Sequence, residues 1–137
     1  MPRILRINHV GLAVQDPAAG EFWQALGLPC KGSETVPRDN VAVSFFPVGD
    51  SRIELLAPDG PEGPVHKFLA NRGEGMHHLC LEVEDLPGLI AQLEAAGVEL
   101  IDHAPRPGAH GMQVAFVHPR ATHGVLVELT EGGAGGE

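Results

Sequence analysis

The first half of the chain begins with alternating apolar and polar positions, which then change to a helical spacing. Residues 4–14 (ILRINHVGLAV) alternate as a half-buried strand does. Asp16 is placed to cap a helix that begins at Pro17, and Gly27 suits the position that follows its last turn. Three apolar side chains share one face of this predicted helix: Phe22, Trp23 and Leu26. The pattern therefore predicts a strand followed by a helix.

A predicted hairpin and a linker complete this half. Residues 41–48 (VAVSFFPV) and 52–57 are strand-like apolar runs, and Gly49-Asp50 between them is typical of a tight turn. Residues 58–74 are rich in Pro and Gly, and we expect them to link the two halves of the chain.

The second half repeats this order of elements. Residues 76–83 predict a strand, Asp85 is a second helix cap, and Gly97 ends the helix. The apolar face of this helix comprises Leu86, Leu89, Ile90 and Leu93.

Shorter segments follow the second helix. We predict a short strand at 98–101, a loop at 105–111, and strands at 112–118 and 124–130. The glycine-rich tail, residues 131–137, is expected to be disordered. The order strand, helix, strands thus occurs twice.

Two similar motifs carry the same residue types in each half. His9-Val-Gly-Leu-Ala-Val-Gln-Asp16 is matched by His78-Leu-Cys-Leu-Glu-Val-Glu-Asp85, and the strand-like segments around Glu54 and Glu128 follow them. The histidines are 69 residues apart and the glutamates 74. We therefore predict two modules, residues 1–57 and 75–130, within one compact α+β domain.

The duplicated residues have the chemistry of a metal site. His9, Glu54, His78 and Glu128 would provide two imidazoles and two carboxylates, which suit an octahedral divalent ion with positions left for water or substrate. The candidate ions are Co²⁺, Ni²⁺, Mn²⁺, Fe²⁺, Mg²⁺ and Zn²⁺. The lack of a thiolate in this set makes a structural zinc site less favoured.

The alternative interpretation places each glutamate on the solvent face of an ordinary alternating strand. For a single glutamate this alternative is favoured, because acidic residues are rarely buried. Glu54 and Glu128 both lie between apolar neighbours, and a carboxylate facing inward must be paired or bound to a cation. The symmetric set of four residues therefore favours the metal site.

Other polar residues near these motifs are weaker candidates. His77 would point to the opposite face of the strand from His78. Cys80 shares the face of His78, where it could line a pocket or simply pack as a small side chain. His110 lies in a glycine-rich loop and is a candidate for ligand contact, although an exposed loop histidine is the more common case.

Composition and charge exclude several classes of function. The net charge is −9, with 18 acidic and 9 scattered basic residues, which argues against nucleic-acid binding. No apolar run is long enough to span a bilayer, and the first residues lack the apolar core of a signal peptide. The two cysteines, Cys30 and Cys80, fit neither a zinc spacing nor a disulfide scaffold. We expect a reduced, cytoplasmic protein.

Several stretches resemble the vicinal-oxygen-chelate (glyoxalase) superfamily, and within it the methylmalonyl-CoA epimerase family. The resemblance covers nearly the whole chain and is carried by NHVGLAV at 8–14, GDSRIELL at 49–56, GMHHLCLEV at 75–83, GAHG at 108–111 and the ending FVHP…GVLVEL at 116–129. It implies two tandem βαβββ modules that form a curved mixed sheet around a metal-binding cup.

The resemblance also implies ligands and a reaction. The family's ligands fall on His9, His78 and Glu128, and Glu54 stands where relatives have Gln or Glu. The implied reaction interconverts (2R)- and (2S)-methylmalonyl-CoA by removing the proton α to the thioester and returning it on the opposite face. Such chemistry needs an acid–base group on each side of that carbon.

The chain departs from the family at one expected acid–base position. Relatives have a glutamate where this chain has Arg38, and the neighbouring Asp39 is our candidate for that acid–base role, beside Glu128. Arg38 is instead a candidate for binding a phosphate or carboxylate of the substrate. The alternative is that Arg38-Asp39-Asn40 forms a solvated turn.

Three other functions remain open within the same superfamily. The first is glyoxalase I, whose bacterial form uses a His/Glu/His/Glu set in the order found here; Glu128 would then be a base as well as a ligand. The others are an Fe²⁺ dioxygenase and a metal-free ligand-binding module. The resemblance also suggests a homodimer. Candidates for contact with the CoA nucleotide are Lys31, Arg52, Lys67, Arg106 and Arg120.

Overall fold

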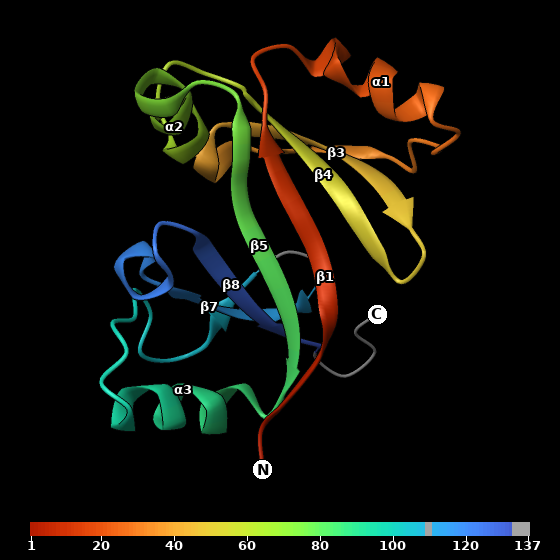
Figure 1. Ribbon diagram of the computed structural model, residues 1–137. Helices are drawn as coiled ribbons and strands as arrows, with labels where there is room; N and C mark the ends of the chain where they lie inside the picture. The colour runs from red at the N-terminus through yellow and green to blue at the C-terminus, as the bar shows by residue number, and fades with distance from the viewer. Residues whose placement is uncertain (109–110, 133–137) are drawn as a thin grey trace. The chain divides into compact units, whose positions relative to one another are not determined.

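The computed structural model describes residues 1–108 and 111–132, which form a mixed α+β fold (Figure 1). The chain divides into two compact units: unit 1 contains residues 1–8 and 78–137, and unit 2 contains residues 9–77. The α+β class predicted from the sequence is confirmed. Within residues 1–108 and 111–132, no helix has both the length and the apolar character needed to cross a membrane.

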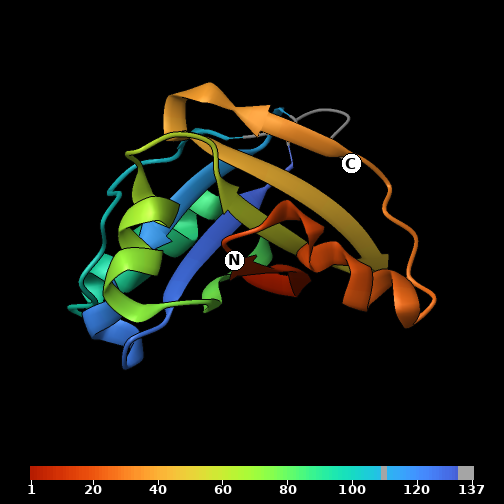
Figure 2. The ribbon, with the colours of Figure 1, turned by 90° about the horizontal axis from the view of Figure 1, so that it is seen from above.

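Unit 2 is built on the second part of β1 (Arg3–Ala13) and on β2 (Ser33–Val36), β3 (Val41–Val48) and β4 (Ser51–Pro58). Strand β1 runs parallel to β4, and β3 is antiparallel to both β2 and β4. The predicted hairpin is confirmed, with β3 and β4 side by side in both views (Figures 1 and 2). Its turn contains Gly49 at φ 56°, a conformation that glycine adopts without steric cost.

The segment expected to be a linker contains a helix that the sequence pattern did not predict. Helix α2 (Pro64–Arg72) begins at a proline, and its Val65 and Leu69 side chains are buried. They join a core cluster with residues from three strands of unit 2: Ala13, Val41, Val43 and Leu56. The Pro- and Gly-rich residues before the helix concealed its apolar positions, which are spaced by one turn.

The first predicted helix is shorter than expected, and its packed side is different. Asp16 Oδ1 accepts a hydrogen bond from the Ala18 N–H at 2.9 Å, and a 3-10 turn, η1 (Pro17–Ala19), leads into α1 (Gly20–Ala25). Phe22 and Leu26 are each 60% exposed, so the prediction of an apolar face does not describe the packed side. Gly20 is the buried residue, and a Cβ atom there would lie 2.9 Å from the Phe46 ring.

Unit 1 contains β5 (Gly75–Glu84) from His78 onward, α3 (Leu86–Ala95), β6 (Arg106–Pro107), β7 (Gln113–Val117) and β8 (Leu126–Glu131). Strand β5 is parallel to β8, and β7 is antiparallel to both β6 and β8. The predicted strand at 98–101 is reduced to a single bridge between Leu100 and Val117.

The first residues of β1 belong to unit 1, where they lie beside β5. Arg3 Nη2 is 2.6 Å from Glu84 Oε1, and Arg6 Nη2 is 3.3 Å from Glu82 Oε2. The full strand order is β2-β3-β4-β1-β5-β8-β7-β6. The element order βαβββ therefore occurs twice, with α2 between the two copies.

Helix α3 confirms the second predicted helix. Asp85 Oδ1 accepts from the Gly88 N–H, and the two carboxylate oxygens of Glu131 accept from the N–H groups of Asp85 and Leu86 at 2.8 and 2.7 Å. These bonds satisfy backbone donors that an isolated helix start leaves without partners. The helix buries its apolar face, namely Leu86, Leu89 and Ile90, in the core of unit 1.

Candidate functional site

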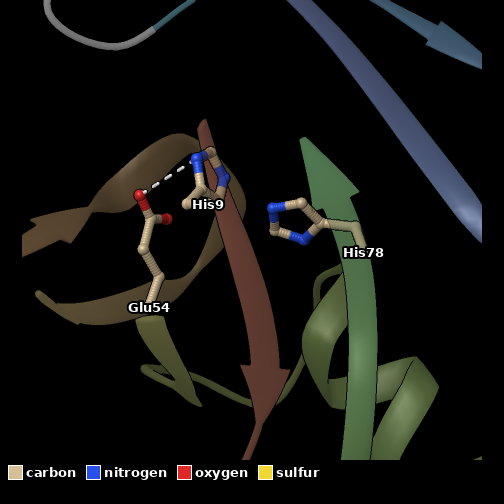
Figure 3. Close-up of side chains that lie close together, drawn as sticks. All are labelled: His9, Glu54 and His78. Atoms are coloured by element: carbon tan, nitrogen blue, oxygen red, sulfur yellow. Dashed lines mark ion pairs between the residues drawn. The ribbon is translucent and has the colours of Figure 1, made fainter. Parts of the chain in front are cut away.

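The first candidate pair lies in unit 2, on two parallel strands. Glu54 on β4 is in register with Gly11 on β1, and His9 precedes Gly11 by two residues, so His9 and Glu54 share one face of the sheet. Because Gly11 has no side chain, the imidazole and the carboxylate can meet across it. His9 Nδ1 lies 3.4 Å from Glu54 Oε2, as the dashed line in Figure 3 shows. Both residues are buried.

The second candidate pair repeats this geometry in unit 1. Glu128 on β8 is in register with Cys80 on β5, and His78 precedes Cys80 by two residues. His78 Nε2 lies 3.4 Å from Glu128 Oε1, the same separation as in the first pair. His78, which Figure 3 draws on β5, is buried, and the Glu128 side chain is 15% exposed. A small residue, Gly11 or Cys80, thus stands opposite each glutamate.

The burial of the glutamates decides between the two interpretations of their strands. Glu54 is 7% exposed and the Glu128 side chain 15%, so neither lies on an open solvent face. A buried carboxylate needs a hydrogen-bonding or charged partner. The solvent-face alternative is therefore wrong for both residues.

Arg52, which the sequence analysis did not place at the site, contacts Glu54. Arg52 Nε donates a hydrogen bond of 2.7 Å to Glu54 Oε2. The sequence analysis predicts Arg52 only as a contact for the CoA nucleotide. The sequence does contain a signal for this contact: Arg52 and Glu54 are two residues apart on a predicted strand, so their side chains lie on the same face.

The donor types in each unit fit a hard or borderline divalent cation. Each unit provides one imidazole nitrogen and one carboxylate group at short separation, and such oxygen and nitrogen donors suit Mn²⁺, Fe²⁺, Co²⁺, Ni²⁺ or Zn²⁺. A cation attracts carboxylates and coordinates neutral imidazole. It would therefore stabilise the imidazole and the carboxylate of each pair at the positions they occupy. The residues present are therefore compatible with the predicted ion.

Two further predicted site residues, Arg38 and Asp39, lie in one short turn. Asp39 is half-buried in the short turn η2 (Pro37–Asp39), and Asn40 after it has φ 52°. This turn is held by a hydrogen bond of 2.7 Å from the Asp59 N–H to the Asn40 carbonyl. Arg38 lies in the middle of the turn. His110 lies outside the described residues.

Cys80 is fully buried, at 0% exposure, on the strand face it shares with His78. Burial to this degree is typical of a packed cysteine. Contact of its thiol with a substrate stays a prediction.

Besides Arg52, two of the candidate residues for CoA binding are already in ion pairs. Arg106 Nε donates to Asp102 Oδ1 at 3.0 Å, and Arg120 Nη2 donates to Glu99 Oε2 at 2.8 Å. The hydrogen bond from Arg120 lowers the pKa of Glu99, and the same bond raises the pKa of Arg120. Glu99 and Arg120 belong to unit 1, as do His78 and Glu128.

Comparison with known proteins gives consistent results. Residues 8–116 match the family model of the Glyoxalase/Bleomycin resistance protein/Dioxygenase superfamily. The chain is 41% identical to the uncharacterized protein YqjC of Bacillus subtilis, covering 92% of this chain and 91% of that one. It is 38% identical to the ethylmalonyl-CoA/methylmalonyl-CoA epimerase of Cereibacter sphaeroides, covering 92% and 97%.

The chain is also similar to a solved structure of an epimerase. The solved protein is a variant of Streptomyces coelicolor methylmalonyl-CoA epimerase in complex with 2-nitronate-propionyl-CoA. The TM-score is 0.85 at 32% sequence identity, with 96% of this chain and 100% of that chain covered.

Proposed function

Since the chain belongs to the Glyoxalase/Bleomycin resistance protein/Dioxygenase superfamily, we propose that it is an epimerase of methylmalonyl-CoA or a closely related 2-substituted acyl-CoA. The observation that carries this proposal is the repeated His–carboxylate pair, with the same 3.4 Å separation in each unit. The 38% identity to an epimerase along almost its whole length selects this chemistry among those of the superfamily.

We propose that His9, Glu54, His78 and Glu128 are the ligands of a divalent cation. When bound, this cation would supply Lewis-acid stabilisation of the negative charge that develops on the thioester oxygen as the α-proton leaves. The ligand assignment rests on residue type, burial and the repetition of the pair.

The proton transfers are assigned to two carboxylates of the chain. A carboxylate oxygen on one side of the substrate takes the proton from C2, whose bonding electrons move into the thioester carbonyl to give an enolate. A carboxylic acid on the other side returns a proton to C2, and the configuration is inverted. Glu128 and Asp39 are the candidates, since each is a partly shielded carboxyl group.

The ligand of the Streptomyces protein supports this reaction. A nitronate is a planar anion whose charge lies on oxygen, as it does in an enolate, and stable mimics of a high-energy species bind enzymes tightly. If this chain performs the same reaction, it should bind the same nitronate more tightly than the substrate.

Glyoxalase I is the second candidate, favoured by one observation. The carboxylate at position 54 completes the His/Glu/His/Glu order, and it is buried beside His9. Glyoxalase I is ranked second because the chain is 38% identical in sequence to the Cereibacter sphaeroides epimerase. The dioxygenase and the metal-free module have no comparable support. The homodimer, the cytoplasmic location and the substrate contacts of Arg38, His110 and Cys80 remain predictions.

The test is exchange of the α-hydrogen of methylmalonyl-CoA in D₂O, followed by NMR with added Co²⁺ and with EDTA. We expect fast exchange that requires the cation. Cation binding without exchange would contradict the epimerase, and the next assay would then use methylglyoxal with glutathione. Exchange that is equally fast in EDTA would contradict the role of the cation.

A further inference from the structure

Arg52 contacts both Glu54, a residue of the candidate site, and the nearby ring of Phe45. Its Nε atom lies 2.7 Å from Glu54 Oε2, and its Cζ atom lies 5.6 Å from the centroid of the Phe45 ring. The Arg52 side chain is 30% exposed, whereas that of Glu54 is 9% exposed. The guanidinium thus covers the carboxylate from the solvent side.

Strand geometry holds this arrangement. Arg52 and Glu54 are two residues apart on β4 and face the same way, while Phe45 on β3 is the direct antiparallel partner of Glu54. The Phe45 ring therefore stands beside the carboxylate and gives the guanidinium a face to lie on. A guanidinium that stacks and donates at the same time has little freedom to turn away.

Unit 1 contains a similar arrangement, but its arginine donates to a different carboxylate. Phe116 on β7 is the direct partner of Glu128, and Arg106 Cζ lies 5.3 Å from the centroid of the Phe116 ring. Arg106 Nε, however, donates to Asp102 Oδ1 at 3.0 Å. Each unit thus has an arginine over the phenylalanine that faces its glutamate, and in unit 2 this arginine binds the glutamate itself.

We infer that Arg52 is a positioning residue: by holding Oε2 of Glu54, the oxygen that lies 3.4 Å from His9 Nδ1, it fixes the orientation in which the carboxylate meets a cation. This inference rests on the proposed function, because it assigns Glu54 a ligand role. Arg52 also compensates the charge of Glu54, so the carboxylate binds a cation more weakly than an uncompensated one would. Glu54 then acts much like a neutral oxygen ligand, and the positive charge of the bound cation remains available to the substrate.

The experiment is Co²⁺ binding to the full chain, measured by calorimetry and by the visible absorption of the bound ion. We expect Arg52→Met to bind Co²⁺ roughly threefold to tenfold more tightly, because the negative charge of Glu54 is then no longer compensated. Its absorption spectrum should also change, because the guanidinium no longer holds Oε2 in one orientation. Arg52→Lys, which keeps the charge but not the planar guanidinium, should retain the wild-type affinity within about twofold.

Two controls isolate the effect. In a Glu54→Gln background, Arg52→Met should change the affinity by less than about twofold, because Arg52 acts through the carboxylate. Arg106→Met removes the matching arginine of unit 1 and should leave both the Co²⁺ affinity and the spectrum unchanged.

The outcomes separate this inference from the proposed function. If the wild type binds Co²⁺ and Arg52→Met binds it with unchanged affinity and spectrum, or more weakly, the inference is refuted while the metal site stands. An equal effect of Arg52→Met in the Glu54→Gln background refutes it as well. If the wild-type chain binds no Co²⁺, the proposed metal site itself fails.

Discussion

Replacement of His78 by alanine is the most direct test of the four-residue ligand set. His78 is buried, and its Nε2 lies 3.4 Å from Glu128 Oε1. The substitution removes one nitrogen donor and leaves Glu128 without its imidazole neighbour.

The size of the effect follows from the number of ligands. A four-ligand site binds zinc with an apparent free energy of roughly 10–16 kcal/mol, so one ligand contributes about 3 kcal/mol if the four share it equally. That loss corresponds to a dissociation constant raised by about a hundredfold or more. Exchange of the α-hydrogen should fall below detection at micromolar cation.

The matched control is His77→Ala. His77 precedes His78 on β5 and faces the other side, where its ring lies 5.0 Å from the ring of Phe68. We expect this variant to bind Co²⁺ with wild-type affinity. Calorimetric titration of both variants, with circular dichroism to show that each is folded, makes the comparison. If His78→Ala binds Co²⁺ within threefold of the wild type, the ligand assignment is wrong.

Three further results are expected. Asp39→Asn should slow epimerisation by about a hundredfold or more while Co²⁺ affinity is kept, because a general acid–base group is lost and no ligand is; unchanged turnover would remove Asp39 from the mechanism. Leu86→Ala should lower the free energy of unfolding by about 2–5 kcal/mol in urea, because Leu86 is fully buried in the core of unit 1; a loss below about 1 kcal/mol would contradict that packing. Glu99→Gln should weaken the dependence of stability on pH in acid. Arg120 lowers the pKa of folded Glu99 below the ordinary 4.5, so the contribution of Glu99 to the free energy of unfolding is full above pH 4.5 and is lost as the pH falls through the lowered pKa. Identical acid unfolding of the variant and the wild type would exclude this contribution.

Periodicity was sufficient where a segment forms its contacts with nearby residues. The run at 41–48 was predicted with the bounds that β3 has, because alternating and apolar residues favour an extended strand and a glycine turn closes the hairpin. The α3 cap at Asp85 was predicted for the same reason, since the cap and the N–H that it accepts are three residues apart.

Periodicity failed where packing partners are distant in the sequence. Helix α2 is held by Val65 and Leu69 against strands β1, β3 and β4, and its own residues give only a weak signal among prolines and glycines. In α1, the choice of packed side was decided by the close approach of Gly20 to Phe46, so Phe22 remains exposed. A helical spacing indicates which residues share a face but not which face the sheet will cover.

The sequence by itself determined which residue types occur twice and at what spacing, and so predicted the histidines, the glutamates and the two rounds of strand, helix and strands. Only the tertiary structure decided that His9 meets Glu54 across Gly11, that His78 meets Glu128 across Cys80, and that Arg52 rather than solvent covers Glu54. The reason is that register between strands distant in the chain depends on how whole faces pack. The sequence specifies the residue types, but the fold determines which group becomes the partner of a buried charge.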